Sequence, residues 1–144
     1  MDKFLVINGP NLNLLGSREP DIYGKYSLSE IEDLTNKRLE NAGHKVDVEW
    51  FQSNGEKEII EKIQAASNAS YKAVIINPAA FSHTSIAILD ALRVLSCPVV
   101  EVHLSNTNQR EEFRSNKITA KSSTAVIEGL KEKGYFLAIL SQLI

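Results

Sequence analysis

The chain has 144 residues, of which 43% are hydrophobic and 24% charged, and its formal net charge is −2. This size suits a single domain, residues 1–144, with a proper core, and the composition is that of a soluble globular protein. The charge gives no reason to expect nucleic acid or an anionic membrane as a partner. No signal pattern or long apolar span is present, so we expect a cytoplasmic protein. One cysteine, Cys97, and three dispersed histidines argue against a disulfide and a structural metal site.

The first predicted strand is residues 4–7, and an unusually long loop, residues 8–26, follows it. A capping-box pattern that begins at Ser27 marks the start of the next helix. Strand-to-helix loops in α/β units usually have about 2–6 residues, and longer ones are often functional. This loop carries several apolar side chains, which argues against disorder. We therefore interpret it as a mobile lid that brings Arg18 and Tyr23 into a site.

The middle of the chain predicts alternating helices and strands. A helix is expected over residues 28–42, with apolar positions on one face. Residues 45–50 alternate apolar with charged side chains, which is typical of a strand at the edge of a sheet. A second capping-box pattern, beginning at Ser53, predicts a helix that ends near residue 69. Residues 73–76 are apolar throughout and predict a central strand.

The last part of the chain predicts a strand over residues 99–103 and then a polar loop. A helical turn that carries Arg110 and Arg114 is expected to follow the loop. A short fifth strand is predicted over residues 118–120. The chain is expected to close with a helical region over residues 123–143, interrupted at one of its glycines.

This alternation predicts an α/β fold, a three-layer sandwich with a five-stranded parallel sheet. An edge-like second strand beside central first and third strands suits the order 2-1-3-4-5. In that topology the site lies beyond the carboxyl ends of the first and third strands, where the chain direction switches. Asn8 and Asn77 end these two strands, so we expect both to face the crevice together with the lid.

The helix expected over residues 84–95 is apolar around nearly its whole circumference. A helix of this kind is buried on both sides. One side can cover the sheet, so the other is expected to meet another subunit, with Asp90 in or near that interface. The alternative is an ordinary helix with some exposed leucines.

Glu101 and His103 are two residues apart on the fourth strand, so their side chains share a face. A carboxylate beside an imidazole fixes its tautomer and favours the protonated form. His103 is therefore a candidate general acid. The alternative is a strand-end histidine with a purely structural hydrogen bond.

Three arginines and a tyrosine are further candidates. Arg110 and Arg114 are four residues apart and share a face on a helical turn, and Arg18 on the lid can join them. Such a cluster favours a small anionic substrate, whereas an isolated pair is often only a solvated face. Nearby cations favour ionisation of a phenol, so Tyr23 is a candidate base, or else it packs to close the loop. His83 can bind a substrate or cap a helix.

Four segments, taken in order, resemble one family. The segments NGPNLNLLGSREPDIYG, QSNGEKEII, INPAAFSHTSIAILDAL and PVVEVHLSNTNQREEFR are similar to type II 3-dehydroquinate dehydratases over essentially the whole chain. The resemblance implies a flavodoxin-like fold, no metal and no organic cofactor. It also implies a homo-oligomer, a dodecamer built from trimers. The implied reaction removes water from 3-dehydroquinate to give 3-dehydroshikimate, by anti elimination through an enolate, in the shikimate or quinate pathway.

The resemblance also implies roles for individual residues. Tyr23 is the base that acts as a tyrosinate, and Arg18 keeps it ionised. His103 protonates the departing hydroxyl and is oriented by Glu101, while Asn11 positions a water against the enolate oxygen. Arg110 is the basic residue near the tyrosine, and Asp90 reaches a neighbouring subunit's site. The groups implied in substrate binding are Asn77, His83, Asp90, Leu104, Ser105 and Arg114.

The chain departs from the family's usual NPGAYTHTS at Ala79, which replaces a glycine, and at Phe81, which replaces a tyrosine. Ala79 costs about 1 kcal/mol if its position requires a positive φ. Two other classes of function remain open. The first is a flavin- or nucleotide-binding module on the same fold, although neither G-x-G-x-x-G nor a Walker loop is present. The second is an idle assembly protein, against which the intact catalytic set argues.

Overall fold

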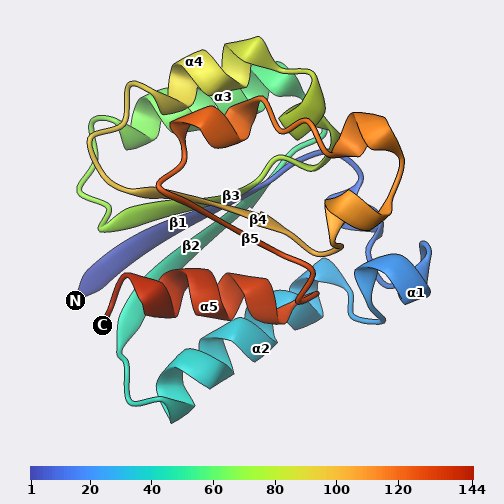
Figure 1. Ribbon diagram of the computed structural model, residues 1–144. Helices are drawn as coiled ribbons and strands as arrows, with labels where there is room; N and C mark the ends of the chain where they lie inside the picture. The colour runs from blue at the N-terminus through green and yellow to red at the C-terminus, as the bar shows by residue number, and fades with distance from the viewer.

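Five parallel strands form one sheet in the order β2-β1-β3-β4-β5, which confirms the predicted topology (Figure 1). The computed structural model describes all 144 residues. The strands are β1 (Asp2–Asn8), β2 (Val46–Gln52), β3 (Ala73–Asn77), β4 (Val99–His103) and β5 (Ala125–Glu128). The central strands β3 and β4 are buried along their whole length, because helices cover both faces of a parallel sheet. β2 lies at the edge, as its alternating pattern predicts.

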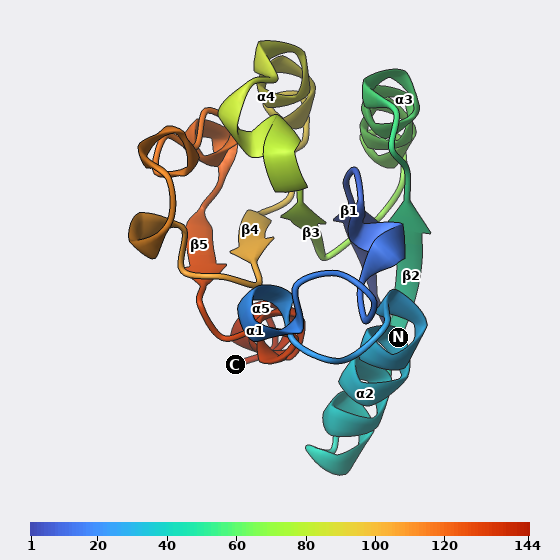
Figure 2. The ribbon, with the colours of Figure 1, turned by 90° about the vertical axis from the view of Figure 1, so that its right-hand side faces the viewer.

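Two helices cover each face of the sheet, as the view onto the ends of the strands shows (Figure 2). α2 (Leu28–Asn41) and α5 (Lys133–Ser141) lie on one face, and α3 (Glu56–Ala66) and α4 (Ile86–Leu92) on the other. Each face therefore has its own cluster of buried hydrophobic side chains. None of these helices is long and apolar enough to cross a membrane.

Residues 8–26 hold two short helical segments, the 3₁₀ turn Leu12–Leu14 and the helix α1 (Pro20–Tyr23). Leu12 and Leu15 are buried in the cluster beneath α2 and α5 and anchor the first half of the loop. The second half, which includes α1, has no buried residue. The loop is thus fixed at its start and more loosely held around α1.

The capping predictions differ in outcome. At α2 the box is present, because the Ser27 hydroxyl accepts from the Glu30 amide and the Glu30 carboxylate accepts from the Ser27 amide. The box predicted at Ser53 is wrong. α3 begins after Gly55, and the Ser53 hydroxyl accepts from the Gly55 amide at 3.0 Å, which makes a local turn before the helix.

The end of the chain also differs from the prediction. The strand expected over residues 118–120 is wrong, because this segment leads into the 3₁₀ turn Thr119–Ser122. The fifth strand is β5, which falls inside the region predicted as helix and pairs with β4. Two adjacent β-branched residues, Val126 and Ile127, favour a strand there. Gly129, at a φ of 86°, ends it, and α5 is correspondingly shorter than expected.

Candidate active site

A cavity of about 120 Å³ lies beyond the carboxyl ends of β1, β3 and β4, at the edge predicted from the strand order. Side chains from three separate parts of the chain meet there: the long loop, the segment after β3 and the segment after β4. The predicted residues among its lining are Asn11, Arg18, Tyr23, Asn77, His83, His103, Leu104, Ser105, Arg110 and Arg114. Of the residues given a catalytic or substrate-binding role, Glu101 and Asp90 alone are absent from the lining.

Glu101 lies behind His103 and holds its ring. The Glu101 side chain is fully buried, and its Oε2 lies 2.7 Å from His103 Nε2. The same oxygen accepts from the Ser82 hydroxyl at 2.7 Å, and Oε1 accepts from the Thr119 hydroxyl at 2.5 Å. A buried carboxylate requires such donors. Because Nε2 is engaged, Nδ1 is the nitrogen of His103 that remains for a ligand in the cavity.

His83 stands beside His103, with stacked rings whose centroids are 6.3 Å apart. It lies in the 3₁₀ segment Ala79–His83 and does not cap α4, whose cap is Ser85. The Nδ1 atom donates to the Asn116 carbonyl at 3.0 Å, which leaves Nε2 for the cavity. Burial lowers the pKa of His83, and the nearby His103 and Arg114 lower it further. His83 is therefore neutral near pH 7, and because its proton is on Nδ1, its Nε2 can only accept a hydrogen bond from a ligand.

Tyr23 ends α1 and lies between two guanidinium groups. The Arg18 guanidinium carbon is 4.4 Å from the centre of the Tyr23 ring, and that of Arg110 is 5.1 Å from it. Both guanidiniums therefore lie against the Tyr23 ring in cation–π contact. Arg18 Nη1 also reaches the Asn11 carbonyl at 3.5 Å, which links the two halves of the loop.

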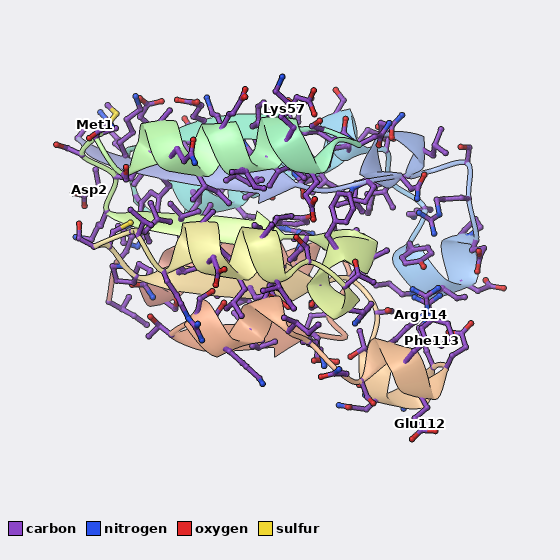
Figure 3. The ribbon with its side chains drawn as sticks, turned by 90° about the horizontal axis from the view of Figure 1, so that it is seen from above. Met1, Asp2, Lys57, Glu112, Phe113 and Arg114 are labelled. Atoms are coloured by element: carbon purple, nitrogen blue, oxygen red, sulfur yellow. The ribbon has the colours of Figure 1, made fainter.

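Arg110 and Arg114 line the cavity, but not from one face of a helical turn, so that prediction is wrong. Arg110 has an extended backbone between the 3₁₀ turns Thr107–Gln109 and Glu112–Arg114. Glu111 accepts from Arg114 Nε at 2.7 Å and orients that guanidinium. Arg114 lies at the same end of the molecule as α1 (Figure 3). Three guanidiniums around one cavity suit a small ligand with a carboxylate or phosphate.

The two strand-end asparagines behave differently. Asn77 lines the cavity, whereas Asn8 is fully buried and does not, so the expectation that Asn8 faces the crevice is wrong. Its side chain instead accepts from the Tyr135 hydroxyl in the core. Ala79, next to Asn77, has a φ of 53°, so this position does require the left-handed region that a glycine favours.

Asn11 lies at the other side of the cavity, with a left-handed backbone at a φ of 69°. Its backbone N–H donates to Asn54 Oδ1 at 2.9 Å. Gln52 donates to the same Asn54 oxygen and to the Gly9 carbonyl, each at 3.2 Å. Residues 52–54, at the end of β2, thus fix the start of the loop. These hydrogen bonds are the contribution of the segment QSN to the site.

Asp90 is exposed on α4 and its nearest cation is Arg93, at 4.0 Å. It takes no part in the cavity of its own chain. One face of α4 is buried, while Ile86 at its start is 61% exposed and Val94, just after its end, is 64% exposed. In a single chain, therefore, the sheet covers only one side of this apolar segment.

Several residues of the site escaped the sequence analysis. Pro10, Leu12, Ala80 and Thr107 line the cavity, and Ser82 and Thr119 bind Glu101. Hydroxyl and small apolar residues carry little chemical signal in a sequence. The one available signal for Ser82 was its place next to His83. No group of three or more His, Cys, Asp or Glu side chains is arranged to hold a metal ion.

Comparison with known proteins gives concordant results. A family model described as dehydroquinase class II matches residues 2–143. The chain is 54% identical over 139 residues to the 3-dehydroquinate dehydratase of Clostridium botulinum, which covers 96% of this chain and 92% of that protein. The crystal structure of type II dehydroquinase from Butyrivibrio crossotus superposes with a TM-score of 0.93 at 42% identity, covering 99% of this chain and 98% of that one. The corresponding structure from Propionibacterium acnes gives 0.91 at 43% identity, covering 99% and 96%.

Proposed function

The chain belongs to the class II dehydroquinase family, and from this premise we propose how its residues carry out the dehydration of 3-dehydroquinate in the shikimate pathway. The enzyme is a hydro-lyase of the type II 3-dehydroquinate dehydratase kind. This assignment takes precedence over a flavin- or nucleotide-binding module. The product is 3-dehydroshikimate, formed by anti elimination through an enolate.

Tyr23 begins the reaction as a tyrosinate, which takes the proton from the carbon next to the ketone. Arg18 and Arg110, on the ring of Tyr23, support its ionised form. The electron pair of the broken C–H bond moves toward the ketone oxygen and gives an enolate. Asn11 positions a water against that oxygen, and such preorganised donors lower the barrier to enolate formation.

His103 completes the elimination. Hydroxide is a poor leaving group, so an acid must protonate the hydroxyl as its C–O bond breaks. The enolate electrons return to form the carbon–carbon double bond, and water departs. Glu101 engages Nε2 of the ring, which leaves Nδ1 as the atom that we assign to deliver the proton.

Substrate binding falls to the remaining groups that line the cavity. The guanidinium of Arg114 and the backbone at Leu104 and Ser105 hold the carboxylate. Asn77 and His83 hold hydroxyl groups. Residues 8–26 close as a lid over the single catalytic domain, which excludes water and strengthens these charge interactions.

The assembly we propose is a homo-oligomer, a dodecamer built from trimers. Ile86 on α4 and Val94 just after it are exposed and give an apolar surface for a neighbouring subunit, and Asp90 between them reaches the neighbour's site. Light scattering tests this assembly. A monomer at micromolar concentration would contradict it.

The observation that carries the mechanism is that Tyr23 and His103 line the same cavity, one with two cations on its ring and the other with a buried carboxylate. The test is an ultraviolet assay for the conjugated enone of 3-dehydroshikimate. Purified enzyme should form it without added metal or cofactor, and EDTA should not change the rate. Absence of enone formation by folded, assembled protein would refute the proposed activity.

A further inference from the structure

We propose that Tyr135 is a positioning residue of the active site, which fixes the orientation of the Asn77 amide through a one-directional chain of hydrogen bonds. The inference rests on the proposed function in one respect, namely that Asn77 binds substrate. Tyr135 itself does not line the cavity.

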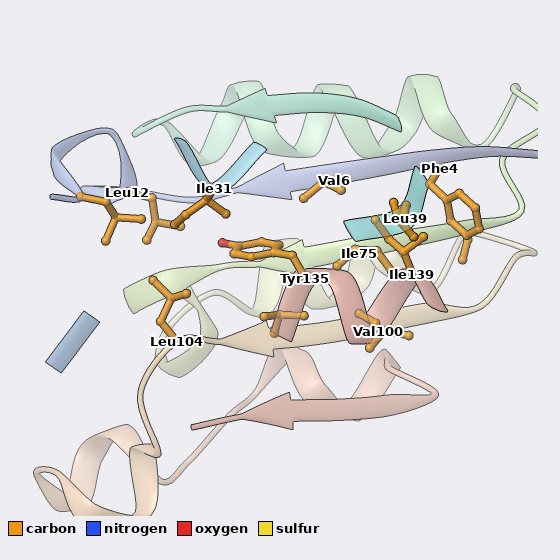
Figure 4. Packing of buried hydrophobic residues seen from close by; sticks show 14 residues of the cluster. Phe4, Val6, Leu12, Ile31, Leu39, Ile75, Val100, Leu104, Tyr135 and Ile139 are labelled. Carbon is orange, nitrogen blue, oxygen red and sulfur yellow. The ribbon is translucent and has the colours of Figure 1, made fainter. Parts of the chain in front are cut away.

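Tyr135 is buried in the core but carries a polar group toward the site. It belongs to α5, is fully buried, and packs at a tilt on Trp50 with ring centroids 5.7 Å apart. Its hydroxyl points toward the carboxyl ends of the strands (Figure 4). A buried phenol requires hydrogen-bond partners, and here the partners are the last residues of β1 and β3, Asn8 and Asn77.

Three hydrogen bonds form the chain. The Ala79 amide donates to Asn77 Oδ1 at 3.1 Å. Asn77 Nδ2 donates to the Tyr135 hydroxyl oxygen at 3.0 Å. The Tyr135 hydroxyl donates to Asn8 Oδ1 at 2.5 Å. All the side-chain atoms involved are buried or nearly so, because Asn77 is only 2% exposed.

The direction of this chain of hydrogen bonds is set at its Ala79 end. An asparagine amide can in principle be turned either way, and a phenol can donate or accept. A backbone N–H, in contrast, can only donate, so Ala79 requires Oδ1 of Asn77 on its side. Asn77 Nδ2 must then face Tyr135, and the single phenol proton must go to Asn8. Burial raises the pKa of Tyr135, so the phenol stays neutral and retains that proton at physiological pH.

Asn8 shows how firmly the direction is imposed. Its Nδ2 is buried and has no hydrogen-bond partner. Turning the Asn8 amide would not help, because Nδ2 and Asn77 would then both donate to Tyr135, and the phenol proton would lose its acceptor. The unsatisfied donor, Asn8 Nδ2, therefore lies at the end of the hydrogen-bond chain that is farthest from Ala79.

The consequence for the site is a fixed polar pattern. Asn77 has one N–H and one oxygen lone pair left after binding Tyr135 and Ala79, and these are what it offers to a ligand. Turning its amide would break two hydrogen bonds among buried groups, which is costly. Without the Tyr135 hydroxyl, only the Ala79 bond resists that turn, and Nδ2 becomes an unpaired buried donor.

The kinetic test compares Tyr135→Phe with Tyr71→Phe. Tyr71 is a matched control, because its hydroxyl donates to Glu49 at 2.8 Å, away from the cavity. We expect Tyr135→Phe to raise KM by about tenfold and to leave kcat within about threefold, since the lost order acts on ground-state binding. Tyr71→Phe should match wild type. A purely structural role would instead reduce the fraction of active enzyme, which lowers kcat and leaves KM unchanged.

A second measurement does not depend on activity. Hydrogen exchange of the Ala79 amide, followed by mass spectrometry of the peptide that contains it, reports on the bond to Asn77. We expect exchange to be about tenfold faster in Tyr135→Phe and unchanged in Tyr71→Phe. If Tyr135→Phe does not fold, Asn8→Ala takes its place. That variant keeps the Tyr135 side chain and removes Asn8 Oδ1, the acceptor of the phenol proton. The same rise in KM and in exchange is expected.

The outcomes separate the two proposals. An inactive but folded wild type refutes the proposed function, and the exchange measurement still decides the hydrogen-bond chain. An active wild type together with a Tyr135→Phe variant whose KM and Ala79 exchange equal those of Tyr71→Phe overturns the role of Tyr135. For Asn8→Ala, wild-type values of KM and Ala79 exchange overturn it in the same way.

Discussion

The two sides of the cavity are built in different ways. One side, the fixed wall, consists of Asn77, His83 and His103, all held by side-chain hydrogen bonds. The other side is the segment 16–26, where the only side-chain hydrogen bonds are made by Ser17 and Arg18 to backbone carbonyls. The proposed acid belongs to the fixed wall, and the proposed base belongs to this segment.

The two constructions match what each proposed role requires. His103 needs a set orientation so that a particular nitrogen faces the substrate, and a buried carboxylate with three donors supplies it. As the proposed base, Tyr23 needs charge stabilisation, and two guanidiniums lie against its ring without a rigid frame. Orientation therefore requires burial, whereas charge stabilisation tolerates exposure and movement.

The largest effects are expected from Tyr23→Phe and His103→Ala. Each removes a proton-transfer group, so kcat should fall by about 10²- to 10⁴-fold in the ultraviolet assay. Thermal unfolding should separate them. His103→Ala leaves Glu101 buried with fewer partners and should lower the midpoint, whereas Tyr23→Phe should not. Near-normal turnover in either variant would refute its role, and equal midpoints would show that His103 is held no more firmly than Tyr23.

The next effect concerns the groups that hold Glu101. Thr119→Val removes the hydroxyl that donates to Oε1 and keeps the shape of the side chain. We expect a loss of about 1–3 kcal/mol in the free energy of unfolding, because a buried carboxylate loses a donor. Ser17→Ala is the matched control, since it removes an exposed hydrogen bond of 2.8 Å to the Leu14 carbonyl. Its effect should stay within about 0.5 kcal/mol. Equal losses of stability in the two variants would show that the fixed wall is no more ordered than the segment 16–26.

The sequence was sufficient for the sheet order because the signals are strong and local. The wholly apolar strand over residues 73–76 and the alternating one over residues 45–50 identify a centre and an edge. It also placed Glu101 and His103 on one face, since a strand has a strict period of two. The family resemblance supplied the roles that residue types alone left open.

What escaped prediction depends on packing. The residue pattern predicts helix where β5 lies, because two residues of β5 are exposed and two are partly buried, without the alternation of a strand with one buried face. Asn8 was expected in the crevice, yet Tyr135 in α5 draws it into the core. Partners distant in sequence, such as Ser82 and Thr119 for Glu101, become visible only when the fold brings them together.

A smaller effect is expected at Ala79, whose backbone N–H donates to Asn77 of the fixed wall. Its φ of 53° strains an L-residue, so Ala79→Gly should raise the free energy of unfolding by about 1 kcal/mol. Ala80→Gly is the control, because Ala80 has no positive φ and lies in the same 3₁₀ segment. That change should destabilise by about 0.5–1 kcal/mol. Urea titration of both variants checks the opposite signs, and a loss of stability in Ala79→Gly would show that the strain is relieved by other contacts.

The smallest effect is a pH dependence of stability that arises from His83. The segment 16–26 contains no histidine and should contribute no histidine titration of its own. Burial lowers the pKa of His83 in the folded protein, so the unfolded chain binds a proton more readily. The contribution of His83 is therefore fully present above about pH 6.5, the usual value for histidine, and is lost as the pH falls below it. Thermal midpoints of wild type and His83→Gln, measured from pH 7.5 down to 5, should converge toward acid. A gap that widens toward acid would mean that His83 gains a carboxylate partner when protonated, and the fixed wall would then be charged as well as ordered.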